Sequence, residues 1–138
     1  MLQQFLEEFC QWKAEGNDPV EFAPDEQGVY WLVLADCLQR VSVSMISLDD
    51  PLDNQALVVE SAVGAWSEQL DIRSLLLMSG SRMFVSRFSL CPRGLEDLLV
   101  VESAVPFQCA SFPLFDRMLR EVMSIVVHLL TPVAVDTE

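Results

Sequence analysis

Two glutamates with identical neighbours are the best candidates in this chain for acid/base chemistry. Glu60 and Glu102 each lie at the fourth position of the sequence Leu-Val-Val-Glu-Ser-Ala-Val, which occurs at residues 57–63 and again at 99–105. Two carboxylates act as general acid and general base when different environments separate their proton affinities. Identical flanking residues provide no such difference. We therefore interpret both glutamates as polar residues on the solvated faces of equivalent strands, and we expect no catalytic residue.

The other reactive side chains form no known catalytic or metal-binding pattern. The four cysteines include no pair separated by two residues, and the single histidine, His128, falls within an apolar helical pattern. The acidic stretch Asp49 to Asn54 lacks the glycine and the closing glutamate that a calcium loop has at fixed spacing. The motifs of nucleotide-binding loops and serine hydrolases are also missing. The sequence therefore predicts a protein that is not an enzyme, with no metal, no cofactor and free thiols.

The hydrophobic pattern predicts the elements that position these residues. Apolar residues at helical spacing predict a helix over 2–15, ended by Gly16 to Pro19, and another that begins near Ser111 and ends at Pro132. Runs rich in β-branched residues predict strands at 29–35, 40–48, 56–63, 82–90 and 98–105, with a helix over 65–79 closed by Gly80. The order α-βββ-α-ββ-α predicts an α+β fold, in which helices flank a mostly antiparallel, twisted sheet. We expect one domain over residues 1–138.

A duplication covers part of this pattern. Residues 40–63 match residues 82–105 at 12 of 24 positions without a gap. Each copy reads as strand, turn and strand, followed by a helix. The repeat predicts two similar strand–strand–helix units that share one sheet.

Composition limits the classes of partner. The formal charge of −13 argues against nucleic acid, since phosphate attraction needs a basic surface. The apolar run 122–135 is too short and too interrupted to span a membrane, and the acidic first ten residues do not resemble a signal peptide, so we expect a cytoplasmic protein. Apolar residues nevertheless make up 51% of the chain, and its mean hydropathy is +0.32. So much apolar surface in a small protein predicts an exposed patch, an oligomer interface or both.

The first helix and the first predicted strand are candidates for such a patch. The helix carries an apolar stripe that either binds a partner or packs on the sheet, and the sequence leaves both open. The members of the stripe are Leu2, Phe5, Leu6, Phe9 and Trp12. Tyr30 and Trp31 are neighbours on a predicted strand, so they point to opposite faces, and at most one of them is expected in the core.

The chain resembles the class I chaperones of bacterial type III secretion, the CesT/Tir-chaperone family. Small size, acidity, a single lysine (Lys13) and the order of the elements carry the resemblance over nearly the whole chain. Residues 25–36, with an acidic turn, a glycine and an alternating apolar run, look like the first strand of the family and are similar to its YscB type.

The resemblance implies a cytoplasmic chaperone that binds the N-terminal region of a secreted effector in extended form and keeps it soluble for export. It implies a homodimer or a heterodimer with another small chaperone. Carried onto this chain, it places Phe5, Phe9 and Trp31 in partner-binding grooves. It places Trp66, Leu70 and Leu76 in a dimer interface. On this assignment, Phe9→Asp should abolish partner capture and leave the fold intact. The alternative is a small regulatory or protein-interaction domain of the same architecture.

Overall fold

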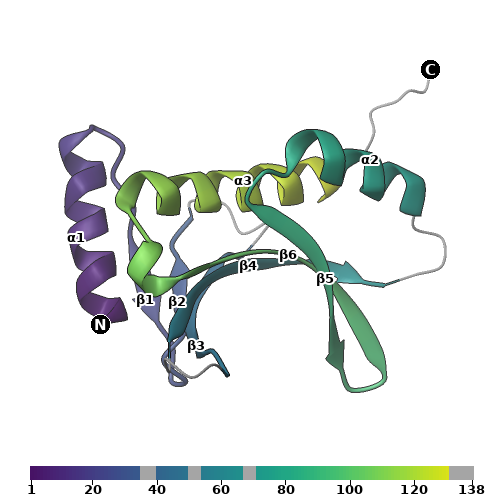
Figure 1. The fold of residues 1–138 in the computed structure, drawn as a ribbon, viewed down its shortest axis with the longest axis horizontal. Helices are drawn as coiled ribbons and strands as arrows, with labels where there is room; N and C mark the ends of the chain where they lie inside the picture. Colours follow the sequence, from purple (N-terminus) through teal and green to yellow (C-terminus); the bar gives the residue numbers. More distant parts are fainter. Residues whose placement is uncertain (35–39, 50–53, 67–70, 131–138) are drawn as a thin grey trace.

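The computed structural model describes residues 1–34, 40–49, 54–66 and 71–130, without the side chains of Arg93 and Leu130. Three α-helices, one short 3-10 helix and six strands make up this part of the chain (Figure 1). In chain order they are α1 (Leu2–Glu15), β1 (Phe22–Pro24), β2 (Tyr30–Leu32), β3 (Ser42–Ser47), β4 (Gln55–Ala65), α2 (Ile72–Arg82), β5 (Ser86–Arg93), β6 (Glu96–Pro106), η1 (Phe107–Cys109) and α3 (Phe112–Leu130).

The six strands form one sheet in the order β1-β2-β3-β4-β6-β5, and every neighbouring pair is antiparallel. Helices α3 and α2 lie over one face of the sheet, and α1 stands beside β1 and β2 (Figure 1). This arrangement confirms the predicted α+β class with flanking helices. The two outer strands differ in length, since β1 has three residues and β5 has eight.

The hydrophobic core lies between the sheet and the long helix α3. Alternate residues of the central strands, among them Val43, Leu57, Val59 and Val101, are fully buried. They meet the apolar side of α3, which contributes Phe115, Met118, Leu119, Val122, Ile125 and Val126. Helix α1 adds Leu6 and Phe9 to the same core, so its apolar stripe packs at least in part on its own protein.

The structure differs from the sequence prediction around the middle helix. We expected a helix over 65–79 closed by Gly80, but β4 continues to Ala65, which pairs with Leu98 of β6. Helix α2 begins only at Ile72, where the Asp71 side chain accepts a hydrogen bond from the N–H of Ser74 at 3.2 Å. Gly80 lies inside this helix. The predicted strand ended at Val63, and pairing with the long strand β6 extends β4 through Gly64 and Ala65.

A short strand precedes those that the sequence indicated. Residues 22–24 form β1 and pair with β2, so four strands rather than three stand between α1 and α2. Three residues are too few to show an alternating pattern, so periodicity does not reveal this strand. Observed β2 (Tyr30–Leu32) is shorter than the predicted strand, whose last residue, Ala35, lies outside the described residues.

The two copies of the repeat lie side by side in the sheet, with β4 and β6 paired at their boundary. Strand β4 pairs with β6 so that Glu60 stands opposite Glu102, the same position of each copy. The preceding strands do not follow the same symmetry. Ser44 pairs with Val58, and the duplication would place Ser86 opposite Val100, but Ser89 holds that position instead. The register of β5 is therefore shifted by three residues, an odd number, which reverses the faces of its side chains.

Candidate functional site

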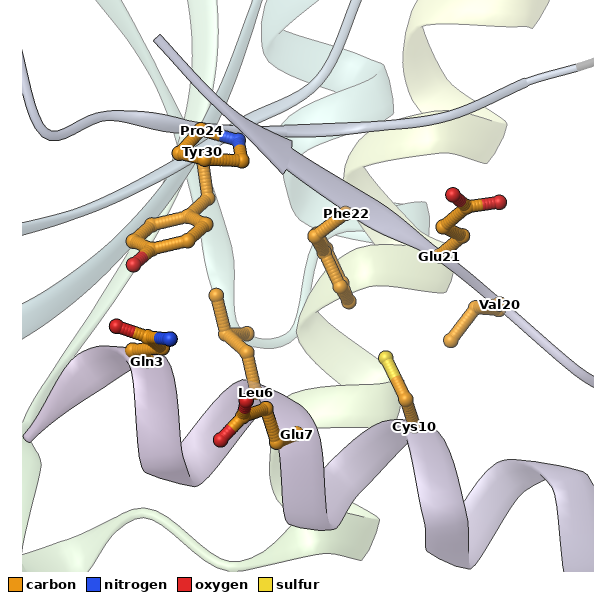
Figure 2. A pocket seen from close by; sticks show the side chains of 9 residues that line it. All are labelled: Gln3, Leu6, Glu7, Cys10, Val20, Glu21, Phe22, Pro24 and Tyr30. Carbon is orange, nitrogen blue, oxygen red and sulfur yellow. The ribbon is translucent and has the colours of Figure 1, made fainter. Parts of the chain in front are cut away.

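A groove between α1 and the β1–β2 strands is the clearest candidate site. It has a volume of about 430 Å³, and nine side chains line it, as Figure 2 shows. Four come from α1 (Gln3, Leu6, Glu7 and Cys10), and five come from the segment around β1 and β2 (Val20, Glu21, Phe22, Pro24 and Tyr30). We call this hollow the α1–β1 groove. Its middle is apolar, with Leu6 and Phe22 pointing into the space between helix and strand (Figure 2).

Helical spacing puts the four α1 residues on one side of the helix. Positions 3, 6, 7 and 10 follow the intervals of three and four residues that bring side chains onto the same face. A second set, Phe5, Phe9 and Trp12, follows the same intervals on the neighbouring face. Helix α1 therefore has two apolar sides, one that forms the groove and one that packs on α3.

The opposite wall is fixed by the turn between β1 and β2. One carboxylate oxygen of Asp25 accepts hydrogen bonds from the N–H groups of Gln27 and Val29, at 2.8 and 3.0 Å. Its other oxygen accepts a hydrogen bond from Nε1 of Trp31 at 2.9 Å. The Trp31 hydrogen bond and these two backbone donors lower the pKa of Asp25 below its usual value. The turn also uses Gly28 in the left-handed region, with φ of 81°, where glycine is favoured.

The groove opens beside an outer edge of the sheet, because β1 is the first strand in the sheet order. The carbonyl of Glu21 accepts a hydrogen bond from the N–H of Val33, and the N–H of Asp25 donates to the carbonyl of Val29. Odd-numbered residues of this strand thus bond to β2, and the N–H and C=O of Phe22 point to the outer edge. An extended segment lying in the groove would therefore meet both apolar side chains and backbone hydrogen-bonding groups.

The electrostatic character of the groove is acidic. Glu7 and Glu21 stand on opposite walls, and none of the nine lining residues is basic. Burial, with a further contribution from the charge of Glu21, raises the pKa of the Cys10 thiol above its usual value. Lys13, the basic residue of α1, does not line the groove and forms ion pairs with Asp18 and Asp116. The groove therefore offers negative charge around an apolar floor.

Two of the predicted partner-binding residues lie on the other side of α1. Phe9 is 0% exposed and stacks edge-on against Phe115, with ring centroids 4.7 Å apart. Phe5 is half-buried and packs against the rings of Phe107 and Phe112 as well as Phe115. A fully buried ring does not reach a partner, so Phe9 is a core residue and its assignment to a groove is corrected. The sequence could not show that Phe9 is buried, because the apolar stripe of α1 includes both residues that line the groove and residues that pack on α3.

Trp31, the third predicted partner-binding residue, follows the groove residue Tyr30 in β2 but does not line the groove. Its ring is half-buried, its Nε1 is bound to Asp25, and the guanidinium of Arg40 lies over it, 4.6 Å from the ring centroid. Its neighbour Tyr30 lines the groove instead. Since adjacent strand residues point to opposite faces, at most one of this pair could line the groove, but the sequence does not say which.

Of the three predicted dimer residues, Leu76 lies on α2. Leu76 is 67% exposed, and Ile72, one turn earlier on the same side of the helix, is 53% exposed. Trp66 is half-buried directly after β4, where its N–H donates to the carbonyl of Asp97. Leu70 lies outside the described residues. Helix α2 thus presents an apolar strip to solvent.

No cluster of three metal-ligating side chains occurs among the described residues. Within the same residues, no helix is both long and apolar enough to cross a bilayer. Glu102 forms an ion pair with Arg87 at 2.9 Å. His128 is exposed on α3.

Comparison with known proteins identifies the fold. No protein-family model and no curated protein matches the sequence. One similar solved structure is the type III secretion chaperone SycH of Yersinia pestis, in complex with a stable fragment of YscM2. It is 18% identical, with a TM-score of 0.58 over 88% of this chain and 97% of the other. Another is ExsC from the ExsC–ExsE complex, 14% identical, with a TM-score of 0.60 over 96% and 97% of the two chains. The chain therefore has the fold of type III secretion chaperones, as the sequence resemblance indicated.

Proposed function

We propose that this protein is a cytoplasmic chaperone that binds the N-terminal region of a type III secreted effector and keeps it soluble and competent for export. The observation that carries the proposal is the α1–β1 groove, an apolar hollow open beside an outer edge of the sheet. The shared fold supports it, because both structural neighbours were solved in complexes with partner proteins.

The geometry suits an extended polypeptide better than a folded surface. A segment beside β1 would bond to the outward N–H and C=O of Phe22 and place alternate side chains against Leu6, Phe22 and Tyr30. Backbone bonds of this kind depend little on sequence, so they would hold the segment extended while the apolar pockets provide specificity. Such binding needs no catalytic group, so we propose a non-enzymatic role.

We further propose that two copies associate through α2 and form a homodimer. The exposed strip on this helix includes Ile72, Leu76 and Leu77, and Phe84 just beyond the helix is 73% exposed. Apolar side chains grouped in this way are typical of an interface. Dimerisation would place one α1–β1 groove on each protomer, well away from the shared helix (Figure 1). The groove would then remain available to an effector.

The experiment that tests the chaperone proposal is capture of the partner from native cells by the tagged full chain. Bound proteins are identified by mass spectrometry, and limited proteolysis maps the protected segment. We expect a secreted protein with a protected segment near its N-terminus. Capture of a partner that is not exported would favour the regulatory or protein-interaction alternative.

A matched pair of variants tests whether the groove is the binding site. Gln3 lines the groove and Gln11 does not, although both are exposed residues of α1. We expect Gln3→Trp to block capture by filling the groove, and Gln11→Trp to capture like the wild type. Equal capture by both variants would place the partner elsewhere.

A further inference from the structure

Two carboxylates flank the apolar floor of the α1–β1 groove. Glu7 belongs to α1 and Glu21 to the segment that enters β1, so they belong to opposite walls of the groove (Figure 2). Neither takes part in the ion pairs found among the described residues. The structure describes the backbone of all eight lysine and arginine residues, and none of these residues lines the groove. The groove thus holds negative charge that no lining residue offsets.

The charge of Glu21 acts on Cys10 at the floor of the groove. The charge of Glu21 adds to burial in raising the pKa of the Cys10 thiol, which shows that a negative charge on the floor is disfavoured. Burial disfavours a charge of either sign, but the contribution from Glu21 is attractive for a cation, and a cation between two carboxylates at a groove open to solvent gains from both. An occupant made only of apolar residues would leave Glu7 and Glu21 partly desolvated without compensation.

We propose that the α1–β1 groove selects an extended segment in which a lysine or arginine is flanked by apolar residues. The basic side chain lies between Glu7 and Glu21, and its apolar neighbours contact Leu6 and Phe22. This selectivity rests on the proposed function and adds to it the chemical class of the segment that the groove takes.

Selection of random 12-residue peptides displayed on phage, with the full chain as target, tests this selectivity. We expect the selected peptides to carry a lysine or arginine next to apolar residues. A synthetic selected peptide is then measured by fluorescence anisotropy at low salt. Loss of both charges in Glu7→Gln/Glu21→Gln should weaken its binding by about three- to tenfold, as expected for two partly exposed ion pairs.

The matched control is Glu8→Gln/Glu15→Gln, which makes the same charge change on exposed residues of α1 outside the groove. It should bind the peptide like the wild type. Equal weakening in both double variants would show an effect of net charge alone and overturn the selectivity. Selected peptides without a basic residue would overturn it as well.

The same measurements separate this inference from the proposed function. Neutral apolar peptides whose binding Gln3→Trp blocks would overturn the selectivity and leave the groove as the effector site. Peptides that bind Gln3→Trp like the wild type, or a library that yields no binding peptide, would count against both.

Discussion

Oε1 of Glu121 accepts a hydrogen bond from the backbone N–H of Phe84 at 2.8 Å, which ties the middle of α3 to the connection between α2 and β5. Its second oxygen accepts the N–H of Val85 at 2.9 Å. Burial alone would raise the pKa of Glu121, but the nearby Ser86 hydroxyl, the two N–H groups and the charge of Arg117 together lower it. The ionised form of Glu121 is therefore part of the folded structure.

Glu121→Gln should destabilise the protein at neutral pH by about 2 kcal/mol, because an amide replaces a charged acceptor of two hydrogen bonds. A lowered folded-state pKa stabilises the fold above the unfolded pKa, and this contribution is lost as the pH falls through the folded pKa. The difference between variant and wild type should therefore shrink below about pH 4. Urea unfolding at several pH values measures it, with Glu8→Gln as an exposed control. A difference that does not change with pH would contradict this role of the charge.

Phe9→Ala should lower the free energy of unfolding by about 3–5 kcal/mol, the usual cost of removing a buried aromatic ring. Phe9 is fully buried among other rings of the core, so the loss leaves a cavity between α1 and α3. Chemical denaturation measures the change. Phe9→Asp should unfold the protein rather than affect capture alone, in contrast to what the sequence led us to expect. A folded Phe9→Asp variant that fails only in capture would restore Phe9 as a partner contact.

Leu76→Glu should shift the protein from dimer to monomer and leave it folded, because the side chain is already exposed on α2. A charge at this position cannot enter an apolar interface without losing its hydration. Light scattering after gel filtration gives the solution mass. Ile46→Glu is the control, since Ile46 is also exposed but belongs to β3. An unchanged mass for Leu76→Glu would remove α2 from the interface.

The sequence revealed the class of the fold and the position of most elements, because long periodic segments such as 2–15 and the repeated strands carry strong signals. It did not separate the two sides of α1. Both Phe9 and Leu6 fit one apolar stripe and both are buried, and only the positions of α3 and β1 decide that Leu6 also borders the groove while Phe9 does not. The polar residues Gln3 and Glu7 lie on the same side of α1 as Leu6, and in the sequence they were the one indication that this side of the helix is partly exposed to solvent.

The repeat shows a similar limit. Identical sequences correctly indicated equivalent strands, and Glu60 opposite Glu102 is their direct consequence in the sheet. The register of β5 followed instead from its connection to β6, a tight turn in which Gly94 has φ of 63° and Arg93 pairs with Glu96. Identical residues in the two copies do not determine the length of the hairpin turn, so the register shift of β5 could not be predicted from the duplication.

Protection of Cys10 in the complex tests the central claim most directly. Cys10 lines the α1–β1 groove, whereas Cys109 is exposed in η1, outside the groove lining, and serves as an internal control. The rate of alkylation of each thiol is measured by mass spectrometry, with and without the captured partner, above neutral pH because the pKa of Cys10 is raised. If the partner lies in the groove, it should slow alkylation of Cys10 strongly and leave Cys109 unchanged. Equal rates for Cys10 in the free and the bound protein would show that the partner binds elsewhere.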